Sequence, residues 1–331
     1  YTYNGNASST GSSSQENDLR VFDHKANGFV LDLAEIVLAR DPAVGAAGYK
    51  VKLSAGETAK FIHAAGLGTQ PTGTANPESF DITEAYVSYT APVGKGMRFD
   101  FGKMVTYHGA EVIEAIDNPN YSRSFLFNYA IPFTHTGLKA SYVFSDNVNA
   151  SFHILNGWDN ATDNNQGKSY GVSLNVAAGD PFSAYINYMQ GPEETNNNHD
   201  MRSLLDLVAT IKPVKPLAII LNYDNGKEEN VQFSPTSSKD AKWSGLSGIA
   251  KYDITDKYAV AVRGEYFNDT DGYRTGTKQK VKESTLTFDA KMADGLIVRP
   301  EYRHDSSDKT SFDNGTKKTQ DTITLGLMYS W

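Results

Sequence analysis

Alternation between apolar and polar residues is the strongest pattern in this chain of 331 residues. It is clearest in residues 322–331, where one face is apolar and the other consists mostly of small or polar residues. The successive side chains of a strand point to opposite faces, so this period of two predicts a β-strand with one apolar side. Residues 283–292 and 296–303 repeat the pattern. In residues 322–331 the apolar face consists of Ile323, Leu325, Leu327, Tyr329 and Trp331.

Segments of this kind follow one another along the whole chain and predict about sixteen strands. The first segment is only a fragment, and the second is blurred because Asp32 and Glu35 fall on opposite faces. The predicted strands are residues 1–4, 29–40, 48–59, 81–91, 97–104, 138–144, 148–156, 168–177, 182–189, 203–212, 217–224, 242–254, 258–268, 283–292, 296–303 and 322–331.

Short and long connections alternate between these strands, and the short ones carry the Gly, Pro, Asp or Asn that tight turns require. An antiparallel up-and-down sheet with short turns at one rim and long loops at the other gives this rhythm, which is typical of outer-membrane barrels. We therefore predict a single barrel over residues 1–331, with the linker-like residues 5–17 as its first external loop. The short connections are residues 92–96, 145–147, 178–181, 213–216, 255–257 and 293–295. The long ones are residues 5–27, 60–79, 106–137, 157–167, 190–201, 225–241, 269–280 and 306–318.

The faces opposite the apolar ones carry many charges. A soluble β-sandwich buries its inner face and would hold few charges there, whereas a barrel of about sixteen strands encloses water. Aromatic residues near the strand ends on the apolar side match the interfacial girdles of membrane proteins. A soluble all-β protein with one solvated sheet face is the alternative fold. The predicted inward set includes Lys50, Lys52, Glu84, Arg98, Asp100, Lys139, His153, Asp206, Lys212, Arg263, Glu265, Glu283, Asp289, Arg299, Glu301 and Arg303. The aromatic set is Tyr89, Phe144, Tyr170, Phe182, Tyr188, Tyr223, Tyr252, Tyr258, Tyr266, Tyr302 and Tyr329.

Composition and charge exclude several structural classes and binding partners. No apolar run reaches the ~18–20 residues that a membrane helix needs, and the mean hydropathy is −0.46. The net charge of −8 argues against nucleic acid, which favours a basic protein face. The absence of Cys excludes disulfides and thiolate metal sites. No signal peptide is visible, so we interpret the chain as mature or trimmed.

Several motifs resemble the OmpL-like outer-membrane β-barrel porin family. The most specific is NPNYSRSFLFNYAIPFTHTG at residues 118–137. Others are GK at 102–103, EVIE at 111–114, NGWDN at 156–160, LRVFD at 19–23, GPE at 191–193, RGEYFND at 263–269 and YRHDSSD at 302–308. The resemblance covers nearly the whole chain. It implies a pore in the bacterial outer membrane, surrounded by lipid and lipopolysaccharide, but no particular substrate. Homotrimers are common among sixteen-stranded porins, and the terminal Trp331 is similar to the C-terminal aromatic residue of outer-membrane proteins.

The long connection at residues 106–136 is the candidate constriction. General porins are similar here, because their third external loop folds into the lumen. We predict the same for this segment, with its aromatic residues as anchors and its charged residues in the pore. The constriction residues would be Glu111, Glu114, Asp117 and Arg123, with the acids facing a wall that bears Lys50, Lys52, Arg98 and Lys103. Opposed charges across a narrow pore set its ion preference. The alternative is an external loop with solvated acids. The anchoring aromatic residues would be Tyr121, Phe125, Phe127 and Phe133.

Two further inward clusters lie on neighbouring predicted strands. Arg263 and Glu265 form one cluster, and Arg299, Glu301 and Arg303 form the other. These residues either line the permeation path as pore wall or form cross-strand pairs that stabilise the wall. The sequence leaves both roles open, and they are compatible.

Signals for catalysis or metal binding are weak. Ser122, Ser124, His108 and His135 permit a Ser/His site, but no GxSxG motif accompanies them. Residues 156–165 are rich in Asp and Asn, yet they lack the spacing and terminal Glu of an EF-hand, and so do residues 304–308. We therefore expect no enzyme activity, no catalytic residues, no metal and no cofactor.

The sequence thus predicts an outer-membrane porin through which small hydrophilic solutes and ions diffuse passively, screened by residues 106–136. Its acidic balance hints at a mild cation preference. The alternative is a plugged barrel that acts as an adhesin, a receptor or an envelope scaffold through its external loops.

Overall fold

The computed structural model describes residues 1–6, 16–67 and 79–331. Within these residues, sixteen strands form one sheet in the order β1, β16 and then downward to β2, and every neighbouring pair is antiparallel. Consecutive strands are neighbours, so the predicted all-β, up-and-down architecture is confirmed. The strands are β1 (Thr2–Asn4), β2 (Ala34–Arg40), β3 (Ala47–Ala55), β4 (Phe80–Ala91), β5 (Met97–Val105), β6 (Thr134–Ser145), β7 (Val148–Leu155), β8 (Ser169–Ala177), β9 (Phe182–Pro192), β10 (Met201–Val214), β11 (Leu217–Ser234), β12 (Ser237–Asp253), β13 (Tyr258–Asp269), β14 (Gln279–Ala293), β15 (Leu296–Ser307) and β16 (Thr319–Tyr329).

The helical elements are short. They are α1 (Glu57–Ile62), the 3₁₀ turn η1 (Ala115–Asp117) and the π-helical turn η2 (Leu126–Ala130). In the described part of the chain, none of them is long or apolar enough to cross a membrane as a helix.

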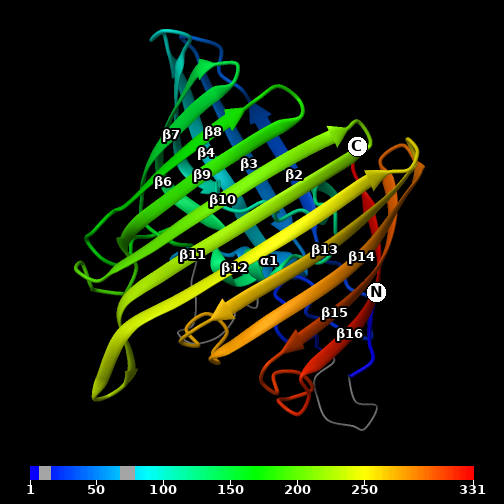
Figure 1. Cartoon of the computed structure of the whole chain (residues 1–331). Coiled ribbons are helices and arrows are strands. Elements are labelled where there is room, and N and C mark those ends of the chain that lie inside the picture. Colours follow the sequence, from blue (N-terminus) through cyan, green and yellow to red (C-terminus); the bar gives the residue numbers. More distant parts are fainter. Residues whose placement is uncertain (7–15, 68–78) are drawn as a thin grey trace.

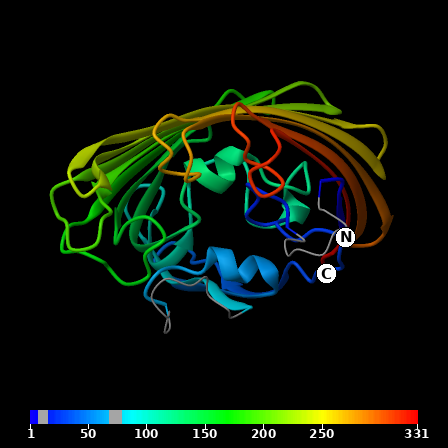
Figure 2. The ribbon, with the colours of Figure 1, turned by 90° about the horizontal axis from the view of Figure 1, so that it is seen from below.

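The sheet curves around an interior that contains η1 and η2 (Figure 2). Its two end strands approach each other through the N-terminal segment. Strand β1 pairs with β16, with Thr2 opposite Thr324, and Thr2 also forms an isolated bridge with Gly28, ahead of β2. Short turns lie at one rim and the long connections at the other (Figure 1).

Three predicted boundaries were wrong. Residues 225–241, predicted as a long loop, instead continue β11 and β12 as a hairpin, with Val231 opposite Lys239. Both faces of this extension are polar, so its sequence shows no alternation between apolar and polar residues that would have predicted a strand. The predicted strand at residues 48–59 ends at Ala55, because Gly56 adopts φ 119° and α1 follows. Strand β2 begins only at Ala34. Residues 7–15 of the predicted first loop and 68–78 of the second lie outside the described residues.

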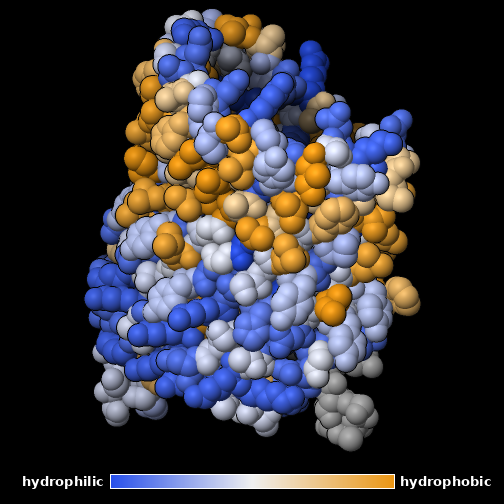
Figure 3. All heavy atoms as spheres, turned by 45° about the vertical axis from the view of Figure 1, so that its right-hand side comes forward, coloured by the Kyte–Doolittle hydropathy of each residue, from blue (hydrophilic) through white to orange (hydrophobic). Residues whose placement is uncertain are grey.

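The outer face is apolar, as the alternation predicted. Figure 3 shows a band of apolar atoms across one side, with hydrophilic atoms at the upper rim and below it, towards the long connections. Every aromatic residue predicted for this face is exposed: Tyr89, Phe144, Tyr170, Phe182, Tyr188, Tyr223, Tyr252, Tyr258, Tyr266, Tyr302 and Tyr329. On β16 the outward residues Ile323, Leu325 and Leu327 are exposed, whereas the alternate residues Thr322 and Thr324 are buried.

This orientation predicts a depth-dependent cost for a charge on the outer face. Leu325→Arg, in the middle of β16, should lower the free energy of unfolding in lipid vesicles by about 2–4 kcal/mol. Thr319→Arg, at the end of the same strand, is the control and should cost about 0–1 kcal/mol. Urea titration of the vesicle-embedded protein measures both. Equal costs at the two positions would contradict a lipid-facing Leu325.

Candidate functional site

Residues 106–133, the inner loop, connect β5 to β6 and lie inside the curve of the sheet (Figure 2). They pack against the strands on the far side of the barrel from β5. Gly109 donates its N–H to Asp206 Oδ2 of β10 at 2.8 Å, and Ala110 donates to Asn222 Oδ1 of β11 at 3.2 Å. Further along, η2 contacts β11 and β12, and η1 contacts β16.

Two glutamates of the wall bind the backbone of the inner loop. Glu301 of β15 accepts the N–H groups of Tyr121 and Ser122 at 2.6 and 2.9 Å. Glu265 of β13 accepts those of Phe125 and Leu126 at 2.7 and 2.6 Å. Each carboxylate therefore holds two consecutive backbone donors. Hydrogen bonds with one charged partner are short and strong, so these contacts fix the position of the loop on the wall.

Three arginines of the same strands bind the carbonyl groups of the loop. Arg263 donates to Ser122 O at 2.6 Å, Arg303 to Arg123 O at 2.6 Å, and Arg299 to Ala115 O at 2.6 Å. A buried backbone needs a partner for each polar group. The wall arginines and glutamates supply these partners, which a loop without regular structure cannot supply for itself.

This placement adds a role that the sequence interpretation of both wall clusters did not include. Arg263, Glu265, Arg299, Glu301 and Arg303 are all buried, because the inner loop covers them. They hold the loop rather than line an open path. Cross-strand pairing is present as well, since Arg263 Nε lies 2.6 Å from Glu283 Oε1 on β14.

The three acids of the inner loop separate instead of facing one wall. Glu111 pairs with Arg263 at 2.7 Å and accepts the N–H of Ser124 at 2.9 Å, so it faces β13. Glu114 forms an ion pair with Lys52 of β3. Asp117 is exposed. The expected opposition to the lysine and arginine wall therefore holds in the structure for Glu114 and is wrong for Glu111.

Arg123 has a packing role that the sequence interpretation missed. It is buried, donates to Tyr121 O at 2.8 Å and to Ile113 O, and lies 4.8 Å from the centre of the Phe22 ring. It therefore joins two turns of the inner loop to the N-terminal segment instead of facing the lumen. Burial lowers the pKa of its guanidinium.

The cations of the opposite wall pair mostly with carboxylates of that wall. Lys50 lies 2.6 Å from Glu84, and Lys103 lies 2.9 Å from Asp81. Arg98 contacts Asp100 at 2.7 Å and Asp41 at 2.9 Å.

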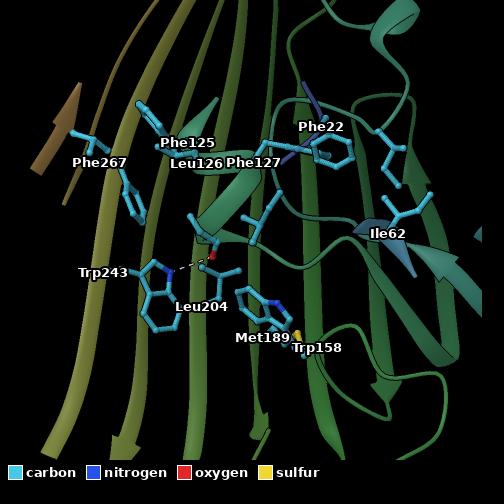
Figure 4. Packing of buried hydrophobic residues seen from close by; sticks show 14 of the residues in the cluster. Phe22, Ile62, Phe125, Leu126, Phe127, Trp158, Met189, Leu204, Trp243 and Phe267 are labelled. Carbon is cyan, nitrogen blue, oxygen red and sulfur yellow. Dashed lines mark hydrogen bonds between the residues drawn. The ribbon is translucent and has the colours of Figure 1, made fainter. Parts of the chain in front are cut away.

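An apolar cluster fastens the inner loop on the side of the long connections (Figure 4). Phe125 and Phe127 pack there with Trp243 and Phe267 of the wall, and Trp243 Nε1 donates to Ala130 O at 3.1 Å. The prediction that the aromatic residues of this loop anchor it is thus confirmed by their packing. Phe133 is partly buried against the cluster, and Tyr121 is buried beside β16, where a Cβ at Gly326 would meet its ring.

The N-terminal segment also lies inside, which the sequence did not predict. Residues 16–27 were expected in an external loop, but Phe22 belongs to the apolar cluster, and Arg20 bonds to Asp305 of β15 with Nε 3.0 Å from Oδ2. The apolar and charged run LRVFD at residues 19–23, within an otherwise polar connection, was the available signal.

Most of the remaining candidate groups have hydrogen-bond partners, but both ring nitrogens of the buried His108 have none among the described residues. Ser124 Oγ accepts the N–H of Phe127 at 3.0 Å, and Ser122 Oγ accepts from Arg263. His135 contacts Gly157 O and Thr106 Oγ1. Asp159, in the Asn-rich connection, accepts the N–H groups of Phe133 and Thr134. Within the ranges 1–6, 16–67 and 79–331, no group of three or more His, Asp or Glu is arranged to hold a metal ion.

Glu265 and Glu301, which bind the backbone of the inner loop, form a glutamate clamp. Neutralising one of its carboxylates should lower the stability of the folded protein. Glu301→Gln replaces an acceptor oxygen by an amide and leaves a buried loop N–H without its partner, which costs about 1–3 kcal/mol. The free energy of unfolding in detergent should fall by that amount. Glu16→Gln, at an exposed glutamate paired with Lys25, is the matched control and should change little. An equal fall in the free energy of unfolding for both variants would show that Glu301 does not hold the inner loop.

Asp32, in the segment before β2, predicts a pH dependence. It accepts the hydroxyl of Tyr121, and burial raises its pKa from 3.8 to about 6. The folded protein thus binds this proton more tightly than the unfolded chain, so the stabilisation is complete below pH 4 and is lost as the pH rises through 6. At about 1.4 kcal/mol per pKa unit, the loss approaches about 3 kcal/mol. Unfolding from pH 4 to 7 should show it in the wild type and not in Asp32→Asn. Parallel curves for the two proteins would contradict it.

Comparisons with known proteins agree with this fold. The outer-membrane channel DcaP of Acinetobacter baumannii superposes with a TM-score of 0.65 at 11% identity, covering 100% of this chain and 94% of that one. The anion-selective porin of Comamonas acidovorans gives 0.62 at 11% identity, covering 91% and 89%. A loop-deletion form of OmpT of Vibrio cholerae gives 0.59 at 14% identity, covering 92% of each chain. No curated protein sequence matches the chain.

The family comparison covers every residue. A family model described as "Putative beta-barrel porin-2, OmpL-like" matches residues 1–331. The motifs that suggested this resemblance include the segment that the wall binds, at residues 118–137, and the strands that bind it. The chain therefore belongs to the OmpL-like β-barrel porins and is a channel protein of the bacterial outer membrane.

Proposed function

We propose that this porin lets small hydrophilic solutes and ions diffuse along the side of its lumen that the inner loop leaves free. The observation that carries the proposal is the contrast between inward cations that the loop leaves free and the inward arginines that it covers. The side chains of Lys50, Arg98 and Lys139 are 28%, 31% and 36% exposed. The inward arginines on the other side, beneath the loop, are at most 2% exposed. Water therefore reaches the inner wall on the β3–β6 side.

The proposed constriction lies where the inner loop reaches across to that wall. Glu114 of the loop meets Lys52 of β3, so this ion pair links the two sides. Asp117 is exposed three residues further along. In this proposal residues 106–136 narrow a single barrel of residues 1–331, and Glu114 and Asp117 are the loop acids that a solute meets. The chemistry is passage, with no reaction.

A plugged barrel is the second candidate, and one observation favours it. The apolar cluster and residues 16–27 fill part of the interior at the long-connection side, as a plug would. Such a protein would act through its outer surface as an adhesin, a receptor or a scaffold. The β11–β12 hairpin, which extends beyond the ends of its neighbours, would be part of that surface.

We further propose that the protein contacts lipid and lipopolysaccharide through its apolar band and assembles as a homotrimer. A trimer form of OmpT of Vibrio cholerae shares the fold at a TM-score of 0.55 and 13% identity, covering 90% of this chain and 96% of that one. This likeness concerns the fold, and the mass of the native complex tests the assembly.

Planar-bilayer recording separates the two candidates. The purified protein should give discrete ion steps if it is a porin. A deletion of residues 111–128 should then give larger steps, because it removes the segment that binds the wall and narrows the lumen. A deletion of residues 229–240, in the hairpin, is the control and should leave the step size unchanged. Silence of the intact protein would reject the porin, and unchanged steps after deletion of residues 111–128 would reject the constriction.

A further inference from the structure

We infer that the channel prefers anions, and that Lys50, Arg98 and Lys139 set this preference. The inference rests on the proposed passage of solutes along the β3–β6 wall. It reverses the cation preference that the net charge of −8 suggests, because the relevant quantity is the charge that a solute meets and not the charge of the whole chain.

Asp100 of β5 lies beneath two cations. Its Oδ1 is 2.7 Å from Arg98 Nε, and its Oδ2 is 3.8 Å from Lys139 Nζ of β6. Its side chain is only 4% exposed, whereas both cations are about one-third exposed. The carboxylate is therefore part of the wall, and the surface above it presents a guanidinium and an ammonium group.

Glu84 of β4 repeats this arrangement. It lies 2.6 Å from Lys50 and 3.6 Å from Lys52, and its side chain is 3% exposed. Lys52 also pairs with Glu114. Among the described ion pairs, Lys50 has Glu84 as its single partner. The buried acids Glu84 and Asp100 thus each lie beneath two cations, with Glu114 and Asp41 as further partners of Lys52 and Arg98, and the side chains of Lys50, Arg98 and Lys139 remain accessible.

The rest of this wall carries hydroxyl and amide groups. Arg98 lies opposite Ser141, and the row continues through Ser151 and Ser173 to Asn187 on β9. The next residue in the row, Asp206, is buried and accepts the N–H of Gly109. The acids of this row are thus either beneath a cation or beneath the inner loop.

The acids that oppose this pattern include Asp117 on the inner loop, Asp41 at the short-turn rim and the partly exposed Glu35 of β2, which accepts the hydroxyl of Ser54 at 2.7 Å. Asp41 is 90% exposed, so salt and water screen it strongly. On the inner loop Glu114 is paired with Lys52, so Asp117 is the exposed loop acid that faces the three accessible cations. Charges at a constriction act on ions at short range, where their sign decides selectivity.

Reversal potentials in a KCl gradient test the inference. The wild type should give a chloride-to-potassium permeability ratio above one. Lys139→Gln and Lys50→Gln should each lower it, by about two- to fivefold, the range for one unit charge at contact distance in water. Asp117→Asn should raise it. Lys282 of β14 is exposed on the outer face, opposite Tyr266 of β13. Lys282→Gln removes the same charge there and should leave the ratio unchanged.

The outcomes separate the inference from the proposed function. A channel with a ratio at or below one overturns the anion preference while the porin stands. If Lys139→Gln and Lys50→Gln change the permeability ratio no more than the control Lys282→Gln does, other residues set the ion preference. Two lysine positions are used so that a folding defect at one does not decide the result, and discrete ion steps in each variant show an intact channel. Absence of any channel rejects the proposed function itself.

Discussion

The constraint on which this structure depends is the need of a buried, irregular backbone for hydrogen-bond partners. Residues 106–133 cross the interior with little regular structure, so most of their N–H and C=O groups cannot bond to one another. Glu265 and Glu301 accept consecutive N–H pairs, and Arg263, Arg299 and Arg303 donate to carbonyl groups. The wall side chains take the place that a neighbouring strand would have. Burying these charged side chains costs free energy, but their hydrogen bonds to the loop backbone offset that cost and allow the loop to be buried.

This binding gives the barrel two unlike inner surfaces. Beneath the inner loop, on β13 and β15, Arg263, Arg299 and Arg303 are buried and paired with acids. Towards β3–β6 the side chains of Lys50, Arg98 and Lys139 are about one-third exposed, and they lie above the buried acids Glu84 and Asp100. A loop held equally by both walls would divide the lumen, whereas a loop held by one wall leaves a path beside the other. The ion pair between Glu114 and Lys52 is the point at which the two surfaces meet.

The sequence predicted the fold well and the site only in part, for a physical reason. Alternation is local, so it gave the strands, their order and the outward aromatic residues. It also placed Arg263, Glu265, Arg299, Glu301 and Arg303 on the inner face. Their partners could not be predicted, because these are backbone groups of a segment about 140–180 residues away, and backbone groups leave no mark in a sequence. Arg123 shows the converse: its charge suggested a pore residue, but its contacts are carbonyls and the Phe22 ring.

The apolar cluster does not require a closed lumen, given where it lies. Phe125, Phe127, Trp243 and Phe267 pack between the inner loop and the wall that binds it, so the apolar contacts reinforce the same face as the glutamate clamp. Hydrogen bonds to charged groups fix position and direction, whereas apolar burial supplies favourable free energy without direction. Together they hold most of the loop to β10–β16, whereas Tyr107, near the start of the loop, stacks on His153 of β7 and donates its hydroxyl to Tyr188 O of β9. Anchoring mainly on one side is what the proposed constriction beside a water-filled path requires. A plug that sealed the lumen would need comparable contacts to the opposite wall, where the structure shows the Glu114–Lys52 pair, the contacts of Tyr107 and cations that are about one-third exposed.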